Sequence, residues 1–432
     1  MRYLQAIRAA RDNPQQVEEL YRAAQAGDAA AEFRADMLAC YQESPQDVLY
    51  AAWYWRLQSP AQEQAERNLP HWKLAIPLSL LTGLALWLLA SEGLAFAGSG
   101  SVPYVMLLWS PVVGIVVLAY LTFTARAGYQ RAAQAGAGLI AATAYAMLLA
   151  AGRPAYRDLM LLHLPLLAFA GVGIGVVGLG ASATDFFAFL ARAIEVVVIG
   201  GVYLIAVFIF VGISLAMSDA LGLSIRARGA QSPFLGAAGL IPVIAVASLY
   251  DPRVGPAEQE FGRGLSRMVA LLPRLLLPLT LVVLVVYLLV IPFNFMAPFE
   301  NREVLVVHNG MLFAVMALLI GATPLRDDDL SPRYRRALRG AIRAVAILVV
   351  LVSIYALSAT VYRTVQGGLT INRLTIIGWN IINTALLALL SIRQFREGEA
   401  GWVAALHTTF RVGGIAYIAW AGFLLLVMPW VF

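Results

Sequence analysis

Four side chains near the C-terminus could together bind an anionic or polar group. Arg363 and Arg373 flank a short polar stretch that separates two long apolar runs. Two guanidinium groups at one tight connection can hold a carboxylate, a lipid phosphate or the carbonyl groups of a neighbouring helix. Asn380 and Asn383 follow in the next apolar run, spaced to share one side of a helix. We predict that these residues, with Thr370, form a polar pocket for a lipid or solute.

A purely structural interpretation of the same residues stays open. Long cationic side chains near the ends of membrane helices commonly extend to the interface with water. Asparagine within a membrane span commonly hydrogen-bonds to a neighbouring helix. The spacing of these residues excludes neither a ligand pocket nor a purely structural role.

The polar stretch also has residues that end one helix and begin another. Gly367 and Gly368 follow an apolar run, as at a left-handed helix end. We predict that Asn372 caps the next helix, which begins near Leu374. Arg373 is unusual there, because a cation lies at the positive end of the helix dipole. Some further interaction must therefore favour it.

The order Tyr362, Gly368-Leu369-Thr370 and Arg373 at the start of a membrane helix resembles a pattern of bacterial membrane proteins, the DUF4153 group, whose signature is of the type YGLTxxR. The resemblance covers about the last quarter of the chain, and here Gln366 and Gly367 widen the gap after the tyrosine. It implies a place in the bacterial inner membrane and no particular mechanism.

Other patterns that could do chemistry are weak. Asp327-Asp328-Asp329 could bind a cation, but acids also stabilise the N-terminus of the helix that follows. Gly173 to Gly178 matches GxGxxG inside an apolar run, with no preceding strand, so it favours helix packing over a dinucleotide. The four histidines lack ligand spacing, and Cys40 is the one cysteine. We predict no metal and no cofactor.

Composition excludes a soluble enzyme and indicates a membrane protein. The chain has 432 residues, 60% hydrophobic and 13% charged, and its mean hydropathy is +0.75. Lys73 is the one lysine, so the net charge of +6 comes from arginine. No basic run alternates with stacking aromatic residues, which argues against nucleic acid as a partner.

Apolar runs long enough to span a bilayer recur along residues 73–432. We predict an all-α transmembrane helix bundle of about eleven spans: 74–97, 102–124, 135–151, 159–181, 194–217, 233–249, 275–296, 304–322, 344–365, 374–392 and 412–432. Arginine is concentrated in alternate loops, which favours a cytoplasmic N-terminus and a C-terminus outside. With the family resemblance, this predicts the bacterial inner membrane.

Residues 1–72 form a separate polar, Ala-rich segment without a signal peptide, and we predict a small cytoplasmic helical domain. Residues 18–28 and 51–61 are similar and 33 residues apart, a spacing like that of tetratricopeptide or Sel1-type hairpins. The aromatic residues Tyr50, Trp53, Tyr54 and Trp55 could be hairpin core or a docking groove. Residues 1–70 could bind a cytoplasmic protein partner.

Three loops have the pattern of surface helices. One has apolar residues between Phe261 and Leu272, and another between Trp402 and Phe410. The third begins at Ser331 and gathers arginines on one face: Arg335, Arg336, Arg339 and Arg343. Such a face next to a span attracts anionic lipid headgroups of the cytoplasmic leaflet, or simply anchors the topology.

Two functions follow from these features. The first is transport, with a lipid or solute reaching the predicted pocket. The second is a membrane-anchored scaffold or sensor that recruits a partner through its N-terminal helices. An enzyme is least favoured, because no nucleophile and base are paired. The sequence leaves open whether the chain forms an oligomer.

Overall fold

The computed structural model describes residues 3–26, 29–57, 71–90, 94–95, 102–221, 231–259, 261, 264–325, 330–399 and 401–432. These residues are almost entirely helical, with no strand among them beyond a single bridge between Ala95 and Pro103. The predicted all-α fold is therefore confirmed. The chain divides into two compact units, Met1–Pro70 and His71–Phe432.

The first unit contains four helices: α1 (Leu4–Ala9), α2 (Pro14–Ala26), α3 (Ala30–Glu43) and α4 (Val48–Leu57). The aromatic residues of α4 divide between two roles. Tyr50 and Trp53 are 4% exposed and belong to the core of the unit. Trp55 is 64% exposed, and Tyr54 stacks on Tyr41 of α3. Tyr50 and Trp53 are thus hairpin core, and a docking groove at the remaining aromatic residues stays a prediction.

Two carboxylates of this unit bind arginines that are distant in the sequence. A hydrogen bond from Arg56 is the main reason that the pKa of Glu18 lies below its usual value. A hydrogen bond from Arg11 does the same for the pKa of Asp47. Asp47 Oδ1 also accepts from the amide nitrogens of Leu49 and Tyr50, so this carboxylate caps α4.

Because the pKa values of Glu18 and Asp47 are lowered, we expect the N-terminal unit to lose stability in acid. A lowered native pKa stabilises the fold above the unfolded value, near pH 4, and this contribution disappears as the pH falls through the native pKa. We expect amide exchange in residues 3–57, corrected for intrinsic rates, to be constant from pH 7 to about 5 and to rise below about pH 4. Asp47→Asn should weaken the pH dependence. A profile identical to that of the wild type would show that the Arg11 pair contributes nothing.

Among its described residues, the second unit contains ten helices that are long and apolar enough to cross a membrane. They are α6 (Trp72–Leu89), α7 (Val105–Ala125), α8 (Tyr129–Ala150), α9 (Pro154–Val177), α10 (Ala183–Ala220), α13 (Gly264–Val290), α15 (Arg302–Ala322), α16 (Pro332–Gly367), α17 (Ile371–Arg396) and α18 (Trp402–Leu426). Short helices complete the unit: η2 (Pro256–Glu258), η3 (Ile291–Asn294), α14 (Ala297–Glu300) and α19 (Met428–Val431). The chain is an integral membrane protein.

The remaining predicted span, 233–249, is broken into α11 (Gln231–Gly239) and α12 (Ile241–Leu249). Pro242 begins the second piece, and each piece is too short to cross the bilayer by itself. The pair nevertheless runs antiparallel along α6. Trp87 lies against Gly236, and Ala75 at the other end of α6 packs with Val243. A discontinuous helix thus replaces the expected continuous one.

The break packs against α6 with almost no side chain between the two backbones. A Cβ on Gly239 would lie 2.9 Å from Gly83 Cα and 3.0 Å from the Thr82 carbonyl oxygen. Gly239→Ala should therefore separate α6 from α11 and lower the free energy of unfolding by about 1–3 kcal/mol, measured by thermal unfolding in nanodiscs. Gly201→Ala is the control, because its Cβ would meet nothing within 4 Å. Equal unfolding temperatures for the two variants would contradict this close packing.

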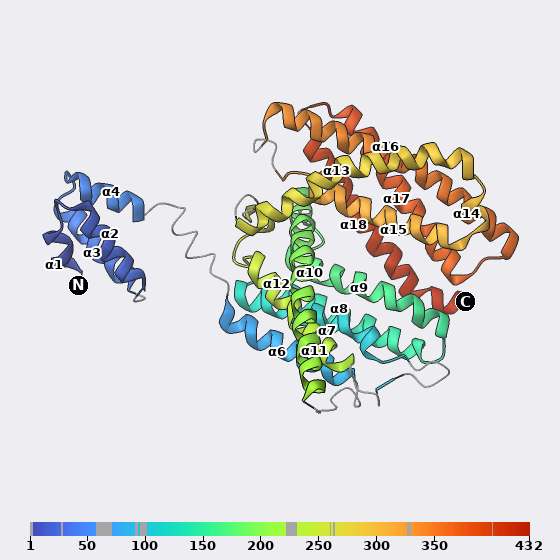
Figure 1. The fold of residues 1–432 in the computed structure, drawn as a ribbon, viewed down its shortest axis with the longest axis horizontal. Helices are drawn as coiled ribbons and strands as arrows, with labels where there is room; N and C mark the ends of the chain where they lie inside the picture. The colour runs from blue at the N-terminus through green and yellow to red at the C-terminus, as the bar shows by residue number, and fades with distance from the viewer. Residues whose placement is uncertain are drawn as a thin grey trace. The chain divides into compact units, whose positions relative to one another are not determined.

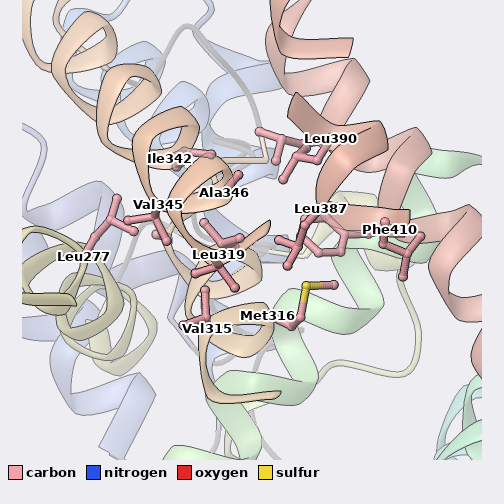
Figure 2. Packing of buried hydrophobic residues seen from close by; sticks show 14 of the residues in the cluster. Leu277, Val315, Met316, Leu319, Ile342, Val345, Ala346, Leu387, Leu390 and Phe410 are labelled. Atoms are coloured by element: carbon pink, nitrogen blue, oxygen red, sulfur yellow. The ribbon is translucent and has the colours of Figure 1, made fainter. Parts of the chain in front are cut away.

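Figure 1 shows α10 between two groups of helices, one containing α6 to α9 with α11 and α12, and the other containing α13 to α18. The largest buried cluster fills the second group (Figure 2). There α16 contributes Ile342 and Val345, α17 contributes Leu387 and α18 contributes Phe410, all less than 5% exposed. This cluster holds α16, α17 and α18 together through residues 338–352, 386–390 and 402–410, and it begins about one turn beyond Asn383 on α17.

Two of the predicted surface helices are wrong. The segment from Trp402 to Phe410 is the first part of α18, and Trp402, Leu406 and Phe410 are at most 4% exposed. The segment that begins at Ser331 continues into the span as α16, with the Ser331 side chain accepting from the amide of Tyr334. Apolar faces of this kind pack equally well on helices and on lipid. The third segment continues into α13, and the side chains of residues 262–270 lie outside the described part of the chain.

Candidate functional site

Arg363 and Arg373 both bind the carbonyl groups at the end of a helix. Arg363 Nη1 donates to the carbonyl oxygens of Phe299 at 3.2 Å and Glu300 at 2.7 Å, at the end of α14. Arg373 Nη1 donates to the carbonyl oxygen of Gly368 at 2.5 Å, at the end of α16. Terminal carbonyls have no partner within their own helix, so each guanidinium caps a negative helix end. This is the interaction that favours Arg373 at its position.

Thr370, and not Asn372, caps α17. The Thr370 side chain accepts from the amide of Arg373, and the helix begins at Ile371. The prediction for Asn372 is wrong because the chain already turns into the helix at residue 371, which leaves Asn372 exposed on its first turn. Gly368 has a φ of +75°, a conformation that glycine adopts without strain.

Asn380 and Asn383 lie near the middle of α17, two to three turns beyond Arg373. Both are almost fully buried, with exposed fractions of 1% and 0%. No hydrogen bond in the described part of the chain joins them to Arg363 or Arg373. The predicted pocket residues therefore fall into two groups: the two arginines, which bind helix ends, and the buried pair of asparagines. Their joint use by one ligand stays a prediction.

Two aromatic side chains and one imidazole are linked to Asn383 by a series of contacts. Tyr417 of α18 donates its hydroxyl to Asn383 Oδ1. The Tyr417 ring lies 5.2 Å from that of Trp379, whose Nε1 donates to His163 Nε2 of α9 at 3.0 Å. We call these five residues the α17 polar cluster: His163, Trp379, Asn380, Asn383 and Tyr417. It connects α9, α17 and α18.

The hydrogen bonds define which groups of the cluster can still donate or accept. His163 Nδ1 lies 2.7 Å from the carbonyl oxygen of Leu159, and because a carbonyl oxygen only accepts, Nδ1 carries the proton. The bare Nε2 then accepts from Trp379, so the imidazole is already satisfied. Asn383 Oδ1 is used by Tyr417, which leaves the Asn383 amide nitrogen facing elsewhere.

Among the described residues, the amide nitrogens of Asn380 and Asn383 have no hydrogen-bond partner. The residues are three apart on a helix, so their side chains are neighbours. An unpartnered polar group in a buried site costs about 1–3 kcal/mol, which the two donors would recover by binding one shared acceptor. The cluster therefore favours the binding of a group with hydrogen-bond acceptors over a reaction, since it pairs no nucleophile with a base.

Sequence reasoning selected the two asparagines but missed their partners. Trp379 and Tyr417 read as ordinary apolar residues of a span, and His163 has no ligand spacing in the sequence. Only the packing of α9 and α18 against α17 brings them together. The presence of an indole N–H and a phenol in apolar runs is a weak signal, because such groups usually find a partner when they are buried.

The arginine-rich face of α16 is used unequally. Arg339 Nη2 donates to the carbonyl oxygen of Gln394 near the end of α17, at 3.0 Å. The Arg343 guanidinium lies 4.4 Å from the ring centre of Phe395. Arg336 is exposed and donates to the carbonyl oxygen of Pro332 in the first turn of the same helix. Arg339 and Arg343 thus hold the end of α17, and Arg335 and Arg336 lie nearer the start of the helix.

Several predicted features have no described structure. Asp327, Asp328 and Asp329 lie outside the described residues. Within the described part of the chain, no group of three or more His, Cys, Asp or Glu side chains could hold a metal ion. Cys40 is a buried residue of the N-terminal core, where burial raises the pKa of its thiol.

Comparison of this chain with family models, with curated proteins and with solved structures finds no match. The similarity to the DUF4153 group accordingly rests on the pattern from Tyr362 to Arg373 alone.

Proposed function

We propose that this chain is a bacterial inner-membrane protein, similar to the DUF4153 group, that provides a path or binding place for a polar lipid headgroup or a small polar solute. The observation that supports this is the pair of buried amide nitrogens of Asn380 and Asn383 in the middle of a span, which have no hydrogen-bond partner among the described residues. Polar groups are costly at such depth and commonly serve substrate pathways. The broken helix α11–α12 is a second feature shared with transporters.

The proposal also includes a cytoplasmic N-terminus and anionic lipid of the cytoplasmic leaflet as a partner. With the N-terminus in the cytoplasm, eleven crossings leave the C-terminus outside, and α11–α12 counts as one of them. The exposed start of α16 then faces the cytoplasmic leaflet, where Arg335 and Arg336 attract anionic headgroups. Cysteine labelling at the exposed positions Gln16 and Val431 in intact cells and in inverted vesicles would test this orientation.

Transport itself is tested with purified protein in proteoliposomes. In one arm, dithionite bleaching of NBD-labelled phosphatidylglycerol reports movement of a lipid between leaflets. In the other, the rate of glycerol-driven swelling reports passage of a small polar solute. Faster rates than in protein-free liposomes in either arm support a conduit and distinguish a lipid from a solute. Rates equal to those of protein-free liposomes in both arms would refute the conduit for these two probe classes.

A scaffold or sensor is the second candidate, favoured by the surface of the N-terminal unit. Val48 is 83% and Trp55 64% exposed on α4, and Leu38 of α3 is 37% exposed. Large exposed apolar side chains of this kind are typical of protein contacts. Native mass spectrometry of protein gently extracted from its own membrane would detect the partner. A partner lost with Trp55→Ser but kept with Gln16→Ala, an exposed control on α2, would support the scaffold.

A further inference from the structure

A second group of buried charges lies far along the chain from the α17 polar cluster, at the end of the bundle where α15 finishes. Arg192 and Glu195 of α10 are 3% and 5% exposed, and Arg192 Nη1 donates to Glu195 Oε2 at 2.5 Å. The Arg192 guanidinium also lies 4.3 Å from the ring centre of Phe261. This arrangement pairs two buried, opposite charges on one face of α10.

A cavity of about 50 Å³ opens beside this pair. It is lined by Glu195 and Ala191 of α10, by Arg274 of α13, by Phe261, and by Thr323 and Leu325 after α15. A water molecule needs about 10–15 Å³ of such volume, so the space suits about three or four waters or one group of similar size. Both a carboxylate and a guanidinium reach this space.

Arg274 carries the charge that is not balanced there. Its Nε is buried and has no hydrogen-bond partner, and no ion pair joins Arg274 to the other described residues. Arg274 therefore places a positive charge with no ion pair among the described residues beside this partly enclosed space. Such a charge is costly unless an anion binds to it.

The neighbouring carboxylate restricts what that anion can be. An oxyanion without protons would meet Glu195 with like charge, because each oxygen only accepts hydrogen bonds. A phosphate group that keeps one proton differs, since its P–OH can donate to Glu195 while its other oxygens accept from Arg274. Arginine matches phosphate geometry with two parallel hydrogen bonds.

We propose that the cavity between α10, α13 and the end of α15 binds one protonated phosphate group. Arg274 is its cationic partner, and Glu195 accepts a hydrogen bond from its P–OH. The group can come from inorganic phosphate or a phosphate monoester in solution, or from a monoester lipid headgroup such as that of phosphatidic acid. This site is independent of the conduit proposed above, because it shares no residue with the α17 polar cluster.

The test uses the full chain in nanodiscs and inorganic phosphate as the probe. We expect phosphate to raise the thermal unfolding temperature of the wild type in a concentration-dependent way, as binding to the native state requires. Sulfate, which has no proton at neutral pH, should stabilise less. Arg274→Gln should weaken the apparent phosphate affinity by roughly tenfold or more. Arg396→Gln, an exposed arginine at the end of α17, should leave it unchanged.

A second measurement distinguishes the source of the phosphate. Native mass spectrometry from nanodiscs that contain phosphatidic acid or phosphatidylcholine reports which lipid stays bound. Retention of phosphatidic acid by the wild type and by Arg396→Gln, but not by Arg274→Gln, assigns the site to a headgroup. Stabilisation by phosphate without lipid retention assigns it to a solute.

Three results would overturn the site. These are the absence of both phosphate stabilisation and lipid retention in the wild type, equal effects of sulfate and phosphate, and equal binding by Arg274→Gln and the wild type. Arg274→Lys guards against misfolding of the glutamine variant, because it keeps the charge and should retain weaker binding.

Discussion

Replacing Asn380 and Asn383 together by leucine should abolish the transport measured in proteoliposomes and at the same time make the protein more stable. Both amide nitrogens are buried without a partner among the described residues, so leucine of similar size removes a desolvation cost of about 1–3 kcal/mol at each site. These two gains exceed the single cost, of about the same size, of leaving the Tyr417 hydroxyl without its acceptor. Leucine also continues the apolar surface that begins one turn later at Leu387. Loss of function with a gain in stability is the signature of polar groups kept for a ligand.

The alternative, simple hydrogen bonding between helices, predicts the opposite. Tyr417 donates to Asn383, and if that bond is the reason for the asparagine, then Asn383→Leu should lower the unfolding temperature and leave transport unchanged. The single variants separate the two residues, because Asn380 has no described bond to Tyr417. Tyr417→Phe is the matched control, since it removes the hydroxyl and retains the ring that packs on Trp379.

Arg339→Ala should destabilise the membrane unit, whereas Arg336→Ala should weaken binding to anionic lipid without changing stability. Arg339 is half-buried and donates to the Gln394 carbonyl near the end of α17, and its loss leaves that acceptor without its charged donor at a cost of about 1–3 kcal/mol. Arg336 is exposed and contributes about 1 kcal/mol to attraction by an anionic surface.

The two effects are measured by thermal unfolding in nanodiscs and by the salt-dependent retention of phosphatidylglycerol. Arg335→Ala provides a second variant near the start of α16. If Arg339→Ala and Arg336→Ala change lipid retention equally and stability not at all, the division of the arginine face into helix-capping and lipid-facing residues is wrong.

Some properties of this protein follow from its sequence because they depend on local composition. Apolar runs of sufficient length specify membrane helices, since a backbone in lipid must satisfy its own hydrogen bonds. Ser331-Pro332 specifies the start of α16 and Gly368 its end, because a side-chain oxygen and a residue without Cβ act within one turn. The helix bundle, its spans and the position of the polar stretch were therefore predictable.

Tertiary structure decided what these elements contact. Trp402 and Phe410 form an apolar face that suits lipid or protein equally, and only packing against α17 and α10 makes it core. Arg363 binds carbonyls more than 60 residues earlier in the chain. The partner of Asn383 likewise depends on which helix faces cross, and helical periodicity alone does not specify this. Sequence determined which polar groups enter the membrane, and long-range packing determined which of them are left without a partner.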